Sequence, residues 1–174
     1  MMAALVSVLL GASAGYYIGM PFSFIGDDMT SIISNQMTET LFGPYVSLPS
    51  FDFIEYLSNN AMVSMNLGIS GIVIGLPPML GLAFNGVVVG FVYGVLPADV
   101  ATVFLVTHGV FEFAGFIIAG GAGIKLGVRL MNRYVDVNQA IEETIRVILA
   151  SQVLIFIAAL LEAFVTPIAA SILI

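Results

Sequence analysis

The stretch Thr107–Arg129, THGVFEFAGFIIAGGAGIKLGVR, is long and apolar enough to cross a bilayer, yet it contains ionisable side chains. His108 is the only histidine of the chain, and Glu112 follows it by four residues, which places both side chains on one helix face. An ionisable pair inside a membrane is energetically costly and by default indicates a functional site. The stretch therefore predicts a membrane-spanning helix with a polar site within it.

Small residues repeat every four positions on three of the predicted helices. Such a stripe lets a second helix approach closely with its backbone, a common form of helix packing in membranes. The stripes are Gly11, Gly15 and Gly19 near the start, Gly86, Gly90 and Gly94 in the middle, and Ala119, Gly123 and Gly127 within the quoted stretch. We expect close helix–helix packing along each of them.

The composition indicates an integral membrane protein surrounded by a lipid bilayer. The 174-residue chain is 60% hydrophobic and 9% charged, with a mean hydropathy of +1.11, whereas a soluble domain carries about 25% charged residues. The net charge of −7 and the lack of basic clusters argue against nucleic acid as a partner, since phosphates require Lys and Arg. The chain has no cysteine, which excludes disulfides and thiolate metal sites.

Hydropathy predicts an all-α fold, a polytopic membrane helix bundle that forms a single membrane domain over residues 1–174. We expect about five crossings of roughly 20 residues each, at 2–20, 53–76, 79–96, 100–127 and 147–168. Residues 21–52 are predicted to form an outer segment that contains an interfacial amphipathic helix near 29–42. Residues 128–146 are predicted to form a loop on the opposite side of the membrane.

The distribution of basic residues predicts the orientation in the cell membrane. All four, Lys125, Arg129, Arg133 and Arg146, flank the loop before the last crossing, and the positive-inside rule makes that loop cytoplasmic. This multi-pass topology gives a cytoplasmic N-terminus and a C-terminus outside. A rival interpretation is that the hairpin at Pro77 and Pro78 is re-entrant and does not reach the cytoplasmic side.

Polar residues of four predicted crossings lie at matching depths, calculated with a rise of about 1.5 Å per residue. His108 lies about 14 Å below Asp99 at the outer end, and Glu162 lies about 24 Å above Arg146 at the cytoplasmic edge. We expect one buried cluster in the outer half of the membrane, made of Asn59, Asn60, Asn85, His108, Glu112 and Glu162.

Three interpretations of this cluster remain open. It could be a satisfied hydrogen-bond network that fixes helix register, or an ion or proton site in which two carboxylates share a proton. Alternatively, His108, Glu112 and Glu162 could hold a divalent metal ion, the one cofactor that the sequence suggests, as in an open zinc site. The His-Glu-x-x-His pattern of metalloproteases is absent, and no second histidine exists. The hydroxyls of Ser64, Ser70, Thr107 and Thr166 are expected to bond to their own helix backbones.

Five short motifs, in this order and spacing, resemble the stage II sporulation protein M family. They are Asn59-Asn60, Asn85-Gly86, His108-Gly109-x-x-Glu112, Gly120-x-x-Gly123 and the run LEAFVTP from Leu161 to Pro167. The similarity extends from Gly15-Tyr16 to Pro167, with Phe113 as a departure where a leucine is expected. The resemblance implies a polytopic membrane protein of about five spans.

The resemblance also implies a class of function. In endospore formers, such proteins anchor a membrane complex with peptidoglycan-degrading partners during engulfment, and the family also occurs in organisms that form no spores, including archaea. It assigns no chemistry to the polar residues. We therefore expect a non-enzymatic scaffold or complex subunit with protein partners or a homo-oligomeric state. The alternatives are a permease or ion-coupled transport subunit, and an intramembrane metal-dependent hydrolase.

Overall fold

The computed structural model describes residues 1–23 and 49–173, and within these ranges it contains helices and no strand. The helices are α1 (Met2–Gly19), η1 (Met20–Phe22), α3 (Pro49–Ile69), η2 (Ser70–Ile72), α4 (Leu76–Val95), α5 (Ala98–Leu130), α6 (Val137–Phe164) and α7 (Thr166–Leu173). The all-α class predicted from the sequence is confirmed. The predicted interfacial helix near 29–42 lies outside the described residues.

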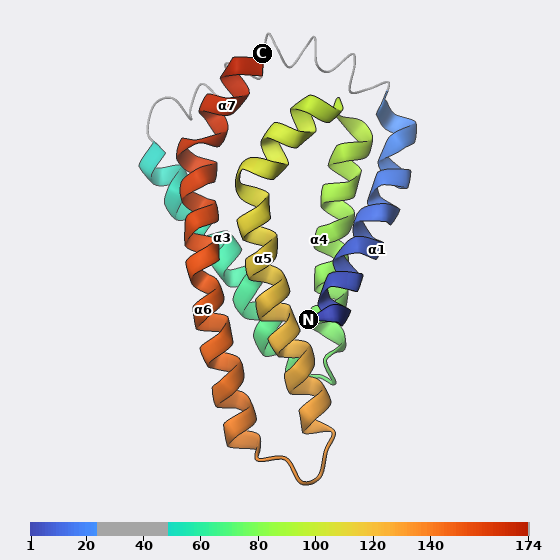
Figure 1. Cartoon of the computed structure of the whole chain (residues 1–174), viewed down its shortest axis with the longest axis vertical. Helices are drawn as coiled ribbons and strands as arrows, with labels where there is room; N and C mark the ends of the chain where they lie inside the picture. The colour runs from blue at the N-terminus through green and yellow to red at the C-terminus, as the bar shows by residue number, and fades with distance from the viewer. Residues whose placement is uncertain (24–48, 174) are drawn as a thin grey trace.

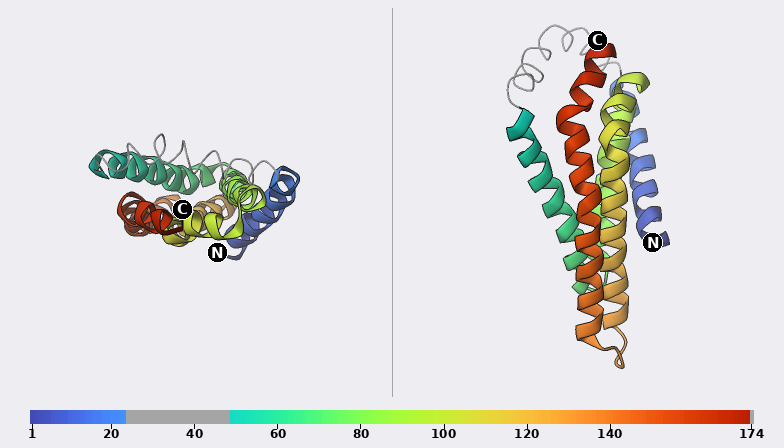
Figure 2. Two further views of the ribbon diagram at one scale, coloured as in Figure 1. Left: turned by 90° about the horizontal axis from the view of Figure 1, so that it is seen from above. Right: turned by 60° about the vertical axis from the view of Figure 1, so that its left-hand side comes forward.

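The helices lie along one long axis and form a flattened bundle (Figure 1; Figure 2). We call the end with the α5–α6 turn the hairpin end, and the opposite end the far end. Seen from above, α5 and α6 lie beside each other, α3 and α4 lie on one side of them, and α1 lies at the edge beside α4 (Figure 2, left). Only a few residues of α3 and α4 touch each other, and α5, which packs against both, forms most of the link between them.

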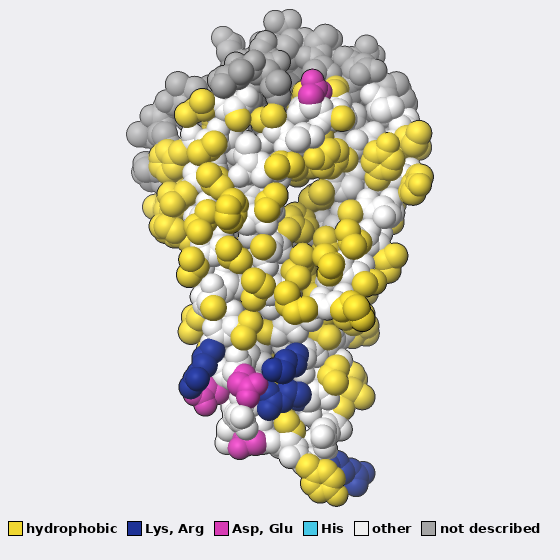
Figure 3. All heavy atoms as spheres, viewed as in Figure 1, with side chains coloured by type: hydrophobic (Ala, Val, Ile, Leu, Met, Phe, Trp, Pro, Cys, Tyr) yellow, Lys and Arg dark blue, Asp and Glu magenta, His cyan; other side chains and the backbone are white. Residues whose placement is uncertain are grey.

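Four of the described helices are long and apolar enough to cross a membrane, namely Met2–Gly19, Leu76–Val95, Leu105–Leu130 and Val137–Phe164. Apolar side chains cover most of the visible face, and charged side chains gather mostly at the hairpin end (Figure 3). Together these features indicate a multi-pass membrane protein. Helix α3 is more polar and is not among the four. It nevertheless runs from the far end toward the hairpin end (Figure 1), and it stays a predicted fifth crossing.

Helices α1 and α4 pack in parallel through their glycine stripes. A Cβ atom at Gly86, Gly90 or Gly94 would overlap the backbone oxygen of Val8, Ala12 or Tyr16, respectively. On α1, Gly11, Gly15 and Gly19 are equally close to the backbone oxygens of Ala83, Val87 and Phe91. The constant offset along both helices shows that they run in the same direction. The chain must therefore return along the bundle between them, which it does in α3.

The third stripe packs α5 against the end of α3 and the turn that follows. Ala119 is fully buried, Gly123 lies against the backbone of Leu67 and Gly68, and Gly127 lies against the backbone of Gly71 and Gly75. Gly75 has a φ of 75°, which glycine adopts without strain, and Ile74 before it has a φ of 57°. The α3–α4 turn is thus held tightly against α5.

The described helices begin and end at positions that differ from the predicted crossings. Helix α3 starts at Pro49 and ends at Ile69, whereas the predicted crossing covers 53–76. The turn comes earlier than the sequence indicated because Pro77 and Pro78 occupy the first turn of α4, where a missing backbone N–H costs nothing. Both prolines therefore open a helix, and residues 73–75 make the turn.

The predicted loop at 128–146 is mostly helical. Helix α5 continues to Leu130, and α6 already begins at Val137, where the Asp136 side chain caps it by accepting a hydrogen bond from the Gln139 N–H at 3.1 Å. Only residues 131–136 form the turn. At its other end α6 stops at Phe164, and Pro167 lies in the first turn of α7.

Candidate functional site

A pocket of about 320 Å³ lies between helices α3, α4, α5 and α6. It is lined by Tyr56, Asn59, Asn60, Asn85, Val88, Val89, Leu105, His108, Gly109, Glu112, Phe113 and Glu162. All six polar residues that the sequence analysis singled out are among these, and they come from four different helices. The structure therefore brings them together around one space.

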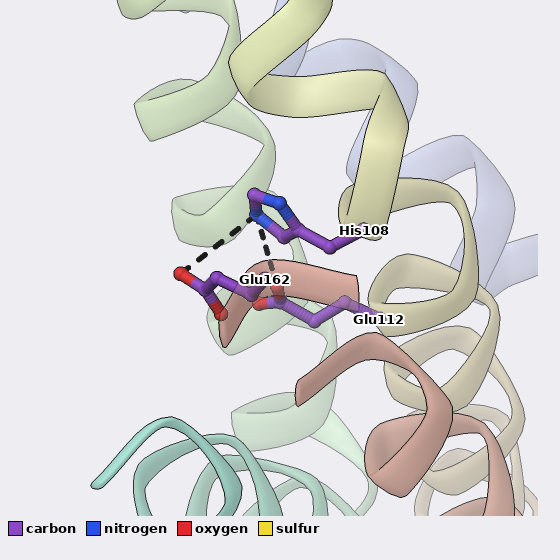
Figure 4. A group of neighbouring side chains, drawn as sticks. All are labelled: His108, Glu112 and Glu162. Carbon is purple, nitrogen blue, oxygen red and sulfur yellow. Dashed lines mark ion pairs between the residues drawn. The ribbon is translucent and has the colours of Figure 1, made fainter. Parts of the chain in front are cut away.

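His108, Glu112 and Glu162 form the ionisable part of the pocket. His108 Nε2 lies 3.9 Å from Glu112 Oε2 and 3.9 Å from Glu162 Oε1, so that one nitrogen faces both carboxylates (Figure 4). The side chains are 13%, 16% and 22% exposed, which means that water reaches them poorly. Glu162 Oε2 is buried and has no hydrogen-bond partner among the described residues. A buried carboxylate oxygen without a partner is unusual and requires an explanation.

Two threonines hold the other side of the imidazole ring. Thr166 Oγ1 lies 3.3 Å from His108 Nδ1 and 2.7 Å from Thr107 Oγ1. Thr107 Oγ1 also lies 2.8 Å from the Val103 oxygen of its own helix, and Thr166 Oγ1, at the start of α7, lies 3.2 Å from the Leu161 oxygen of α6. These contacts tie α5 to the break between α6 and α7 and fix the orientation of His108.

The amide side chains line the rest of the polar wall. Asn60 is buried, with 8% of its surface exposed, whereas Asn59 is exposed at the margin of the pocket. Asn85 donates a hydrogen bond from Nδ2 to the Gly81 carbonyl oxygen at 2.8 Å. That bond uses one of the two amide hydrogens, so the carbonyl oxygen and the second N–H of Asn85 are the groups that it can offer to a ligand.

Below the pocket, toward the hairpin end, the same four helices are closely packed. Leu67, Leu82, Phe116 and Ile155, one from each helix, are between 0% and 5% exposed and belong to one hydrophobic cluster. Beside them, Ser64 Oγ lies 3.2 Å from Ser151 Oγ, and Gln152 Nε2 donates to Ser64 Oγ at 3.2 Å. We call the four apolar residues the floor of the pocket.

The basic side chains lie far from the pocket. Glu143 accepts hydrogen bonds from Arg129 at 2.5 Å and Lys125 at 3.4 Å, and Glu142 accepts one from Arg146 at 2.5 Å. All of these groups belong to the hairpin end of α5 and α6. Within the described residues, neither Glu112 nor Glu162 has a Lys or Arg partner, so His108 is their nearest potential cation.

Two residues, Thr166 and Tyr56, contribute to the site beyond those predicted from the sequence. Thr166 was expected only to bond to its own backbone, yet it also contacts His108; its position four residues after Glu162 was the available signal, because that spacing shares a helix face. Tyr56 also lines the pocket, and its position three and four residues before Asn59 and Asn60 was the available signal, because that spacing shares a helix face. Ser64 contacts α6 through Ser151 and Gln152, contrary to the expectation of a backbone bond alone.

Comparison with known proteins identifies the family. The chain is 28% identical over 163 residues to an uncharacterized protein, MJ0793, of Methanocaldococcus jannaschii, covering 87% of this chain and 89% of that protein. No solved structure matches the chain. The family model described as stage II sporulation protein M matches residues 4–167, a range that includes all four pocket helices. The chain belongs to the stage II sporulation protein M family.

Proposed function

We propose that this protein is an integral membrane scaffold, a subunit around which a membrane complex assembles. The observation that carries the proposal is the floor of the pocket. Leu67, Leu82, Phe116 and Ile155 fill the layer below the polar residues, whereas a permease needs access to its site from both sides of the membrane. A closely packed layer on one side of the site suits a subunit that binds rather than transports.

The sequence supports a role in assembly as well. Residues 21–52, predicted to lie outside, carry only acidic charges, with Asp27, Asp28, Glu39 and Asp52. A surface of one charge sign steers partners of the opposite sign toward it. The family description refers to sporulation, whereas the relative described above comes from Methanocaldococcus jannaschii, an archaeon. We therefore propose a scaffold without attaching it to spore formation.

The orientation proposed for the scaffold follows from the basic residues. With Lys125, Arg129, Arg133 and Arg146 in the cytoplasm, the N-terminus is also cytoplasmic and the C-terminus lies outside. The pocket then lies in the outer half of the membrane. A complex built on this subunit would be organised mainly on the outer side.

Isolation of the natural complex tests the proposal. A tagged chain expressed from its own locus is solubilised in a mild detergent, with and without prior cross-linking, and the particle mass is compared with the 18.4 kDa of one chain. We expect a larger particle that contains a second copy or another protein in fixed ratio, and we expect it to persist in Glu162→Gln. A lone chain in cross-linked natural membranes contradicts the scaffold.

An ion-coupled transport subunit is a second candidate, and a specific observation favours it. Two carboxylates and an imidazole buried between membrane helices are typical of proton and ion pathways. Reconstitution of the purified chain into proteoliposomes distinguishes the two functions. Flux of protons or cations that disappears in Glu162→Gln but persists in Glu142→Gln supports transport, whereas equal leakage of all three proteins supports the scaffold.

A further inference from the structure

We propose that His108, Glu112 and Glu162 bind a divalent metal ion of the zinc class, through Nε2 of the imidazole and one oxygen of each carboxylate. The remaining coordination position faces the pocket. This inference goes beyond the scaffold proposal and does not depend on it, because metal binding is a property of the isolated chain.

The distances suit this ligand set. One potential ligand atom from each residue can be chosen so that all three lie within 4.8 Å of one another. Zinc bonds of about 2.0 to 2.2 Å at tetrahedral angles place ligand atoms roughly 3.4 Å apart. The two distances of 3.9 Å from His108 Nε2 are slightly longer, so small rotations of flexible glutamate side chains complete the geometry.

The contacts of His108 leave its metal-binding nitrogen free of protein donors. Thr166 has one hydroxyl proton, and when the Leu161 oxygen accepts it, Thr166 Oγ1 can accept the proton of Nδ1. In that tautomer the Nε2 atom presents a lone pair to two carboxylate oxygens, an arrangement that requires a metal ion or a proton between them. A histidine ligand whose other nitrogen is hydrogen-bonded is the usual arrangement at metal sites.

Glu162 provides an independent reason for a cation. Its Oε2 atom is buried and has no partner among the described residues, so the carboxylate has an unused acceptor inside the protein. Two ionised carboxylates with a neutral imidazole carry a charge of −2 in a region of low dielectric constant, which a divalent ion neutralises. Open zinc sites likewise have three protein ligands, and here the pocket lined by Asn60 and Asn85 leaves space for a further ligand.

The experiment measures metal binding by the full chain, prepared without a polyhistidine tag, in lipid nanodiscs. Chelator-treated protein is equilibrated with Zn²⁺, and bound metal is determined by mass spectrometry and by competition with a chromophoric chelator. We expect one Zn²⁺ ion per chain, with affinity lowered by at least about tenfold in His108→Gln, Glu112→Gln and Glu162→Gln. Glu142→Gln is the matched control, because Glu142 is exposed at the hairpin end and pairs with Arg146.

Co²⁺ absorption and thermal unfolding provide the second readout. Zinc should raise the unfolding temperature of the natural protein and of Glu142→Gln, but not that of the three ligand variants, because only binding to the folded state stabilises it. Visible Co²⁺ bands that change in His108→Gln support the imidazole ligand. If one variant does not fold, the other two give the same comparison. Metal-free natural protein, or equal affinity in all variants, overturns the site and leaves the scaffold proposal untouched.

Discussion

His108 is held at Nδ1 of its ring by Thr166, and its Nε2 atom faces the two carboxylates. The threonine contacts no carboxylate in the structure, so its effect on a bound ion is indirect. It fixes the ring in the orientation that the pocket requires. At the scale of single residues, the site therefore depends on a side chain outside the ionisable group.

Replacement of Thr166 tests this positioning role. In Thr166→Val the ring loses its hydrogen-bond partner, and we expect the affinity for Zn²⁺ to fall by about 10- to 100-fold while one ion still binds per chain. Thr166→Ser retains the hydroxyl and should bind zinc nearly as tightly as the natural protein. Chelator competition measures both affinities. Equal binding by the valine and serine variants contradicts a role for the hydroxyl.

Phe116 is one of the four residues that form the floor of the pocket. Its side chain is 1% exposed and packs between the four helices, so Phe116→Ala should lower the free energy of unfolding by about 3 to 5 kcal/mol. Phe84→Ala is the control, since Phe84 is 67% exposed and faces the surroundings in the folded protein. Thermal unfolding in one detergent compares the two variants. Similar losses in both would show that the floor is not closely packed.

The helices meet through glycine stripes, and their spacing was readable from the sequence because period four is the period of a helix face. Which helix faces which was not readable. Gly90 could have met any neighbour, and the structure pairs it with Ala12 of α1 in parallel. The choice depends on tertiary packing, which a single stripe does not encode.

Alanine substitutions at Gly90 and Gly109 test how closely α1 and α4 pack. A Cβ at Gly90 would lie 2.8 Å from the backbone nitrogen of Tyr16 and closer still to Ala12, so Gly90→Ala forces α1 and α4 apart. We expect a loss of about 1 to 3 kcal/mol. Gly109→Ala places the same methyl group in open space, with nothing within 4 Å, and should stabilise its helix by about 0.5 to 1 kcal/mol. Thermal unfolding distinguishes the two, and equal shifts contradict the α1–α4 seam.

Helix ends were less predictable than helix faces. Two consecutive prolines indicated a turn, but proline is equally suited to the first turn of a helix, and α4 uses them there. Likewise, the polar residues from 137 to 146 looked like a loop because hydropathy was the only guide. Asp136 instead caps a helix that extends beyond the apolar crossing, by accepting a hydrogen bond from the Gln139 backbone N–H. Hydropathy indicates which residues can lie within the membrane, but it does not indicate where a helix begins or ends.

Polar side chains gather in two separate parts of the molecule, and they differ in kind. The hairpin end carries the paired charges of α5 and α6, and the far half carries the pocket, with the floor between them. The sequence predicted the members of the pocket from their depths, because rise along a helix converts residue number into distance. It could not predict the rotation of each helix, which decides whether polar side chains at one depth meet. The unpartnered oxygen of Glu162 also required coordinates.

The path of the chain through the membrane is testable with single cysteines, because the natural chain contains none. Tyr134, in the α5–α6 turn, is 95% exposed, and Val73, between α3 and α4, is 61% exposed. Asp99 is exposed at the start of α5. If α3 crosses the membrane, Tyr134→Cys and Val73→Cys lie in the cytoplasm, and Asp99→Cys lies outside.

We expect a membrane-impermeant maleimide to label Asp99→Cys in intact cells, and to label Tyr134→Cys and Val73→Cys only after the cells are opened. Thermal unfolding of each purified variant serves as the control for folding. Labelling of Val73→Cys from outside, with Tyr134→Cys still protected, means that α3 and α4 form a re-entrant hairpin. Since α1 packs in parallel against α4, with Val8 beside Gly86, the start of α1 lies near the level of the start of α4, and that result would also require α1 to begin within the membrane. The apolar length of α1, 18 residues, therefore favours a full crossing by α3.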